Sequence, residues 1–187
     1  REFDRIVKSG RSHLQDATPI RLGQEFAAYG HTVRRNRARL DRAAEDLKDL
    51  GIGGTAVGTG LNAERRYPEL MVKHLKAATR LDLRVGPDPV QLMQSMGDVA
   101  AFSGAVRALA VDLNKIANDL RLLASGPRTG LAEIALPAVQ PGSSIMPGKV
   151  NPSIAEMVNQ VCFQVLGTDQ PVALAAEAGH LELHWMR

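Results

Sequence analysis

Residues 90–124 read VQLMQSMGDVAAFSGAVRALAVDLNKIANDLRLLA, and this stretch decides the fold. Apolar side chains recur in it every three or four residues, which is the spacing of one face of an α-helix. They are Val99, Phe102, Val106, Leu109, Leu113, Ile116 and Leu120. The pattern predicts one helix from Val90 to Ala124, roughly 50 Å long at 1.5 Å per residue, which Ser125-Gly126-Pro127 ends.

Most of the remaining chain has the same helical character. Aromatic residues make up 4% of it, whereas alanine and leucine are abundant. Because helices much longer than three or four turns rarely stand alone, we expect an all-α, long-helix bundle, packed within one chain or between copies. The single extended loop region should lie at 129–152, and no internal domain boundary is evident. Further helices are predicted over 21–50, ending at glycines, over 68–80 and over 153–166, with a break at 167–171 before another apolar run from Val172.

Bulk properties restrict the class of protein. The 187 residues include 44% hydrophobic ones, but no apolar run approaches the roughly 20 residues that span a membrane. A net charge of +3 is too small to indicate a nucleic-acid partner, although it favours an acidic substrate. One cysteine, Cys162, excludes an internal disulfide and sits among apolar neighbours. The chain opens at Arg-Glu-Phe-Asp without a signal peptide, so we expect part of a longer cytoplasmic protein.

Residues 142–152, Gly-Ser-Ser-Ile-Met-Pro-Gly-Lys-Val-Asn-Pro, concentrate usable chemical groups. Glycines and prolines flank two hydroxyls, a cation and an amide, which is typical of a loop that closes over a substrate. Ser143 is a candidate base if backbone N–H groups and a lysine stabilise its alkoxide. Lys149 and Asn151 supply a charge and directed hydrogen bonds for a carboxylate, and Ser144 supplies a hydroxyl. From composition alone, a solvated surface loop is the plainer explanation.

A second candidate segment, 10–26, begins GRSHLQDA and continues through Pro19 into the next helix. Ser12 and His13 place a hydroxyl beside a group that changes charge near neutral pH, so they could contact a carboxylate and a leaving group together. A solvated loop histidine is the alternative for His13 taken alone.

Three other patterns are weaker. The glycines at 51–54 lack the hydrophobic strand that a dinucleotide fingerprint needs, and Gly148-Lys149 lacks the spacing and hydroxyl of a phosphate loop. His180 and His184, four residues apart, would supply half a metal site on a helix, so we expect no metal. The arginines at 34–39 are followed by acidic residues on the same helix, so a salt-bridged face is favoured over nucleic-acid binding.

The eleven-residue order at 142–152 resembles a motif of the fumarase/aspartase superfamily, whose members eliminate water, ammonia or an amine from dicarboxylate-type substrates. The resemblance covers nearly the whole chain and corresponds to the central helical region of such proteins. Other blocks that carry it lie at 10–26, 54–62, 115–121, 125–128 and 130–133.

The resemblance implies roles for individual residues. Ser143 would be the general base and Ser144 would bind the carboxylate beside the carbon that loses its proton. Lys149 and Asn151 would bind the other carboxylate, and Ser12 and His13 would contact carboxylate and leaving group. The superfamily usually has threonine at the position of Ser12 and asparagine at that of His184, so this chain departs from the pattern at both.

The resemblance also implies a homotetramer with active sites built from three subunits, and no organic cofactor. Within the superfamily, residues 156–165 and 175–179 look like aspartate ammonia-lyases, whereas fumarases differ there. We therefore expect elimination of ammonia from aspartate to give fumarate, with the malate-to-fumarate reaction of a class II fumarase as the alternative. A noncatalytic helical scaffold is the alternative from another class. The segments outside this region should be needed for turnover, so the piece alone is expected to be inactive.

Overall fold

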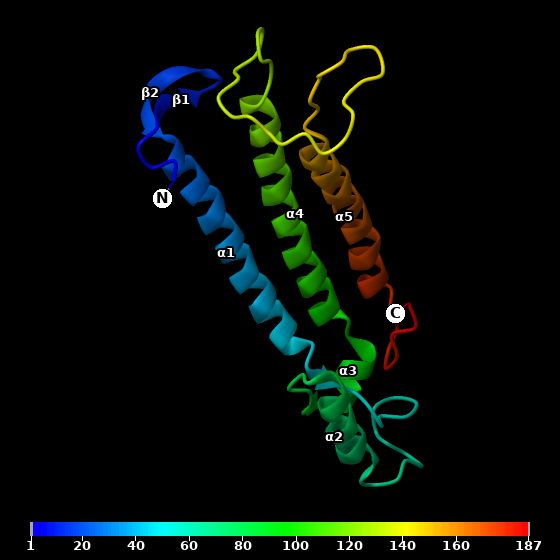
Figure 1. The fold of residues 1–187 in the computed structure, drawn as a ribbon. Coiled ribbons are helices and arrows are strands. Elements are labelled where there is room, and N and C mark those ends of the chain that lie inside the picture. The colour runs from blue at the N-terminus through cyan, green and yellow to red at the C-terminus, as the bar shows by residue number, and fades with distance from the viewer. Residues whose placement is uncertain (1, 187) are drawn as a thin grey trace.

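A computed structural model describes residues 2–186, and three long helices dominate it. They are α1 (Leu22–Asp46), α4 (Gly97–Leu123) and α5 (Ser153–Glu177). They run side by side with α4 in the middle, packed against α1 on one side and α5 on the other (Figure 1). The all-α class is confirmed, with two small sheets added.

The helices meet through buried polar contacts as well as apolar packing. Between α1 and α4, fully buried Asn36 donates to Asp112 (Nδ2 to Oδ2, 2.6 Å). Between α4 and α5, buried Asn159 donates to Asn114 (Nδ2 to Oδ1, 2.6 Å). A buried amide without a hydrogen-bond partner costs free energy. These pairs therefore favour one register of α1 and of α5 along α4.

The predicted helix from Val90 to Ala124 is wrong at its start. The structure divides it into α3 (Pro89–Gln94) and α4, with Ser95 in an extended conformation between them. The Ser95 hydroxyl accepts a hydrogen bond from the Gly97 backbone N–H (3.4 Å), so a local side-chain contact replaces the helical one.

The predicted break at 167–171 is also wrong, because α5 continues through both Gly167 and Pro171. Tertiary contacts hold this turn. The largely buried Asp169 carboxylate accepts from Ser103 (2.7 Å) and pairs with Arg107 (3.1 Å), both on α4. Packing on a neighbouring helix thus outweighs the weak intrinsic helix propensity of glycine and proline.

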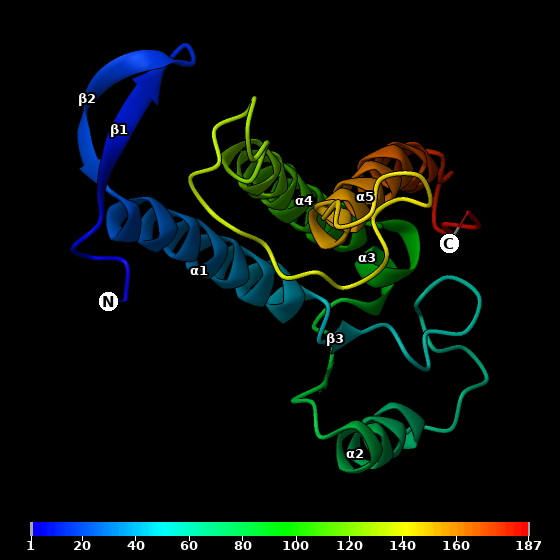
Figure 2. The ribbon, with the colours of Figure 1, turned by 45° about the horizontal axis from the view of Figure 1, so that its top comes forward.

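The end of the bundle near α3 carries a small βαβ unit instead of the last turn predicted for the helix over 21–50. Strand β3 (Asp49–Leu50) pairs in parallel with β4 (Arg84–Val85), and α2 (Tyr67–Thr79) lies between them in the chain (Figure 2). The predicted helix over 68–80 is confirmed by α2. Residues 51–66 form a second extended loop, so 129–152 is not the single one.

The opposite end carries an antiparallel hairpin that the helical pattern did not predict. Strands β1 (Val7–Ser12) and β2 (Gln15–Arg21) pair across a two-residue turn, and β2 leads directly into α1. Both turn residues, His13 and Leu14, have positive φ (55° and 63°). Hairpin turns of this kind usually contain Asn or Gly, so the sequence lacked the usual signal.

Two further expectations concern the packing of Cys162 and the presence of a membrane-spanning helix. Cys162 is a packed thiol with 2% exposure, and burial raises its pKa, as its apolar neighbours predicted. In residues 2–186, no helix combines the length and apolarity required to cross a membrane.

Candidate active site

Both segments singled out by their chemistry lie at one end of the bundle. The hairpin precedes the first residue of α1, and the loop at 142–152 precedes the first residue of α5. The last turn of α4 ends between them, as Figures 1 and 2 show. The helices therefore carry two candidate groups of side chains to the same end of the molecule.

The loop at 142–152 is closed at its neck by a hydrogen bond from a side chain to the backbone and by a close approach of two backbone segments. The Asn151 side chain donates to the Gly142 carbonyl (Nδ2 to O, 2.7 Å). Gly142 approaches Lys149 so closely that a Cβ there would lie 1.8 Å from the Lys149 carbonyl oxygen. Gly148 has φ of +80°, a conformation that favours glycine. The glycines are thus required by the shape of the loop.

Ser143 has the surroundings expected of a stabilised oxyanion. Its Oγ accepts hydrogen bonds from the backbone N–H groups of Ile145 (3.3 Å) and Met146 (3.2 Å). Two donors aimed at one oxygen favour its deprotonated form, because each bond strengthens when the oxygen carries negative charge. This geometry suits a base.

Lys149 and Ser144 are exposed and available. Within residues 2–186, the Lys149 ammonium has no ion pair and the Ser144 hydroxyl has no hydrogen bond. Lys149 lines a cavity of about 460 Å³ between the loop and the turn that follows α4. An unpaired cation at the edge of a cavity can bind a carboxylate.

Ser12 and His13 lie at the tip of the hairpin. Ser12 is the last residue of β1 and lines a cavity of about 490 Å³ between the hairpin and α4, while His13 occupies the turn. Neither side chain has a hydrogen bond to another of the described residues. The tip is therefore open to contacts with a substrate or another subunit.

The structure brings four of the six predicted site residues together and leaves two apart. Ser143, Ser144, Lys149 and Asn151 share the loop, but no hydrogen bond or ion pair within residues 2–186 joins them to the hairpin tip. A site that uses both groups therefore needs either the loop of one copy and the hairpin of another, or a substrate that bridges the loop and the hairpin of the same copy.

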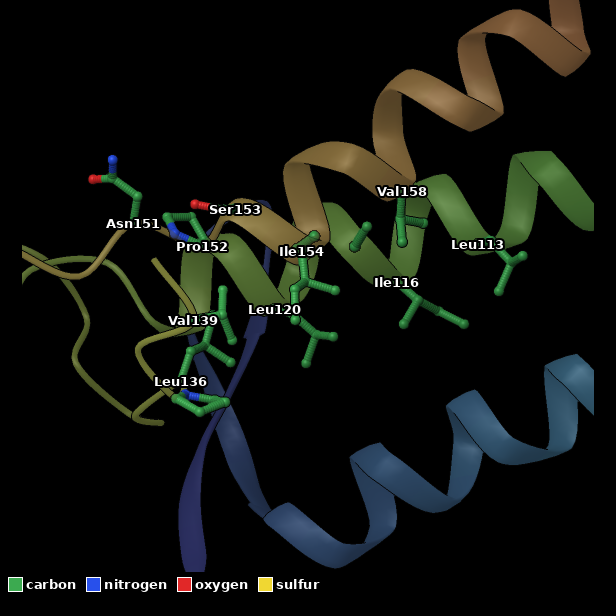
Figure 3. A pocket seen from close by; sticks show the side chains of 13 residues that line it. Leu113, Ile116, Leu120, Leu136, Val139, Asn151, Pro152, Ser153, Ile154 and Val158 are labelled. Carbon is green, nitrogen blue, oxygen red and sulfur yellow. The ribbon is translucent and has the colours of Figure 1, made fainter. Parts of the chain in front are cut away.

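The apolar cavity beneath the loop has a different character. It measures about 300 Å³ and lies between α4, the start of α5 and the preceding segment. Figure 3 shows Leu120, Val139 and Ile154 turned toward it, with the Asn151 amide pointing away. Because aliphatic side chains line it, this cavity is unsuited to a dicarboxylate.

A cluster of charged side chains joins the hairpin to the end of α4. Lys8 pairs with Glu25 of α1 (2.8 Å) and with Glu133 (2.7 Å), and Arg11 also pairs with Glu133. Sequence reasoning missed this cluster, because its partners are 17 to 125 positions apart and no local pattern relates them.

No metal centre is evident among the described residues, which contain no group of three or more His, Cys, Asp or Glu side chains able to hold an ion. The helix assumed for His180 and His184 is wrong, since α5 ends at Glu177. His184 is instead buried with 1% exposure, and its Nε2 donates to the Ala176 carbonyl (3.2 Å). This hydrogen bond therefore holds the segment after α5, to which His184 belongs, against the last turn of that helix.

The arginines at 34–39 lie on α1 and contact neighbours on the same helix. Arg37 pairs with Asp41 (3.8 Å), and Arg39 donates to Asn36 (2.9 Å). The predicted salt-bridged face is present in part, through the pair between Arg37 and Asp41.

Comparison with known proteins agrees with this geometry. A sequence model described as Lyase matches residues 1–167. Aspartate ammonia-lyases from Bacillus subtilis and Escherichia coli are 53% and 49% identical over 186 and 185 residues, which is 99% of this chain and 39% of each relative. This chain thus spans about two fifths of the length of the curated relatives it matches.

Solved structures give the same result. A structure described as fumarate lyase:delta crystallin from Brucella melitensis, bound to cobalt, has 52% sequence identity and a TM-score of 0.91, over 98% of this chain and 40% of that one. A class II fumarase from Schistosoma mansoni has 34% identity and a TM-score of 0.92, over 98% of this chain and 41% of that one.

Fold, loop and sequence matches agree on one class of protein, the helical lyases. This chain belongs to the lyase family, within the fumarase/aspartase superfamily that its motifs resemble. The expectation about family is confirmed, whereas the roles of the individual site residues stay predictions.

Proposed function

We propose that this chain is the central helical region of an aspartate ammonia-lyase, which eliminates ammonia reversibly from L-aspartate to give fumarate. One observation carries the proposal: the Ser143 hydroxyl oxygen accepts hydrogen bonds from two backbone N–H groups. The similarity to aspartate ammonia-lyases at about 50% identity supports the choice of substrate.

The proposed reaction starts with the Ser143 alkoxide. It takes the proton from the β-carbon of aspartate, so that an O–H bond forms and the C–H bond breaks. The electron pair moves into the adjacent carboxylate and gives an enediolate-like dianion. The C–N bond then breaks, its electron pair leaves with the nitrogen, and a carbon-carbon double bond remains.

Catalysis in this scheme depends on holding the dianion more tightly than the substrate. Ser144 would bind the carboxylate beside the reacting carbon, and Lys149 the other one. Asn151 uses one of its two amide N–H groups to close the loop, so the second is available for the same carboxylate. Ser12 and His13 would contact the substrate from a neighbouring copy of the hairpin.

Assembly into a homotetramer is part of the proposal. Ile154, Met157 and Val161 lie on one face of α5 and are 55%, 50% and 54% exposed. Three large apolar side chains at helical spacing are a suitable contact surface for another copy. Such contacts would bring a second hairpin toward the loop.

A class II fumarase is the second candidate, supported by the likeness to the Schistosoma mansoni enzyme. Water would leave in place of ammonia, with the same base and the same binding groups.

The deciding experiment follows the ultraviolet absorbance of fumarate formed by the full-length protein from aspartate and, separately, from malate. We expect the higher kcat/KM with aspartate. Faster production from malate would favour the fumarase, and no product from either would reject both candidates.

A further inference from the structure

Glu133 is held rigidly just beyond the end of α4. Its backbone N–H donates to the carbonyl of Leu123 (2.9 Å), and the preceding Ala132 donates to that of Ser125 (2.8 Å). Ala132 has φ of 50°, an uncommon conformation for a residue with a side chain. Such a conformation persists only where the surroundings determine it, so the backbone fixes where the Glu133 carboxylate begins.

The Glu133 carboxylate binds both cations of strand β1. Its Oε2 lies 2.7 Å from Lys8 Nζ, and its Oε1 accepts from Arg11 Nη2. The exposed fractions of the three side chains are 18% for Glu133, 10% for Lys8 and 21% for Arg11. The Arg11 contact is a charge-assisted hydrogen bond and the Lys8 contact is an ion pair. Both are partly shielded from water, which makes them stronger than ion pairs on an open surface.

These bonds supply the charged link between the hairpin and the end of α4. At its base the hairpin is continuous with α1, and the Leu22 backbone N–H donates to the Ile6 carbonyl (2.9 Å). Nearer the tip, Arg11 directly precedes Ser12, so the Glu133 carboxylate holds the residue next to a predicted substrate contact. A change at Glu133 should therefore reach Ser12 and His13.

The charges are stable at neutral pH. Burial raises the pKa of Glu133, but its contacts with the cations of Arg11 and Lys8 outweigh burial and leave that pKa below its ordinary value. Burial lowers the pKa of Lys8, but its bonds to Glu133 and Glu25 raise it above its ordinary value. Both partners thus stay ionised.

Glu133 also lines the cavity of about 460 Å³ that Lys149 borders. A free carboxylate there would repel a dicarboxylate substrate. With its charge already compensated by two cations, Glu133 is suited to hold the protein together rather than to bind substrate.

We propose that Glu133 is a positioning residue: its carboxylate holds the β1–β2 hairpin against the end of α4 and thereby sets where Ser12 and His13 meet the substrate. The effect on substrate rests on the proposed function, whereas the effect on the hairpin does not.

The test is Glu133→Gln in the full-length protein, which keeps the size of the side chain and removes its charge. We expect KM for aspartate to rise by about five-fold or more, because misplaced contacts lose binding. Hydrogen exchange of the amides at 7–21 should accelerate. A merely structural loss would reduce the amount of active enzyme and lower kcat without changing KM. Glu133→Asp keeps the charge and should recover most of the lost affinity.

Glu45→Gln is the matched control, since Glu45 also binds two cations, Lys48 (2.5 Å) and Arg84 (2.8 Å), but at the far end of α1. It should leave KM and hairpin exchange unchanged. Unchanged KM and exchange in Glu133→Gln, or equal changes in both variants, would overturn the proposal. Faster hairpin exchange in a protein that forms no fumarate from aspartate would retain the anchor and reject the proposed function, so the two failures are distinguishable.

Discussion

The loop at 142–152 and the hairpin at 7–21 lie at the same end of the bundle, but different contacts hold them in place. The loop is fixed by bonds within itself, such as that from Asn151 to Gly142. The hairpin is fixed by Lys8 and Arg11 bonding to Glu133, more than 120 positions away. The difference shows that contacts within its own sequence hold the loop. The position of the hairpin against α4, in contrast, depends on the distant Glu133 carboxylate.

The largest expected effect is in the loop. Ser143→Ala in the full-length protein removes the proposed base, so kcat should fall by on the order of 10² or more. Steady-state fumarate formation measures it, and circular dichroism checks that the variant is folded. Near-normal turnover would remove Ser143 from the role of base.

Lys149→Ala should raise KM for aspartate by about ten-fold or more and lower kcat as well, since the charge would be lost in both the ground state and the transition state. Lys73→Ala is the control, because Lys73 is an exposed lysine on α2 at the opposite end of the molecule. Equal kinetics for the two variants would place Lys149 outside the site.

We expect the stability that the ion pairs of the hairpin contribute to depend on pH, and we expect no such dependence from the loop. Because the pKa of Glu133 is lowered on folding, its ionised form contributes stability above the ordinary pKa of 4.5. That contribution is lost as pH falls through the lowered value. Glu133→Gln should therefore reduce the free energy of unfolding at pH 7 by about 1–2 kcal/mol, and by less at pH 3. Urea unfolding at the two pH values measures this, and a pH-independent difference would contradict the ion-pair account.

The smallest expected effect is at the hairpin turn. Leu14 is exposed and has φ of 63°, so Leu14→Gly should relieve strain and leave stability unchanged or raise it by up to about 1 kcal/mol. The midpoint of urea unfolding tests this. A clear loss of stability would mean that the Leu14 side chain makes a contact that matters, in the assembly or in the chain itself.

Local patterns predicted much of this molecule. The stripe from Val99 to Leu120 predicted most of α4, and the glycines and prolines at 142–152 predicted a loop. These features depend on neighbours within a few positions, which a sequence displays directly.

Features that depend on distant contacts were not predictable. The continuity of α5 through Pro171 depends on Asp169 meeting Ser103 and Arg107, and the hairpin has a turn without the usual Asn or Gly. Glu133 lay inside a recognised block, but nothing local related it to Lys8 and Arg11. For Asp169 and Glu133 the deciding partner is far away in the sequence, whereas for the hairpin the local turn signal is absent.

The central claim is that the loop of one copy and the hairpin of another form one site. Co-expression of full-length Ser143→Ala with full-length Ser12→Ala/His13→Ala tests it directly. Random mixing would give about a quarter of the sites an intact loop and an intact hairpin from different copies. The account predicts fumarate formation from aspartate well above that of either variant alone. No recovery in mixed assemblies that are folded and tetrameric would contradict it.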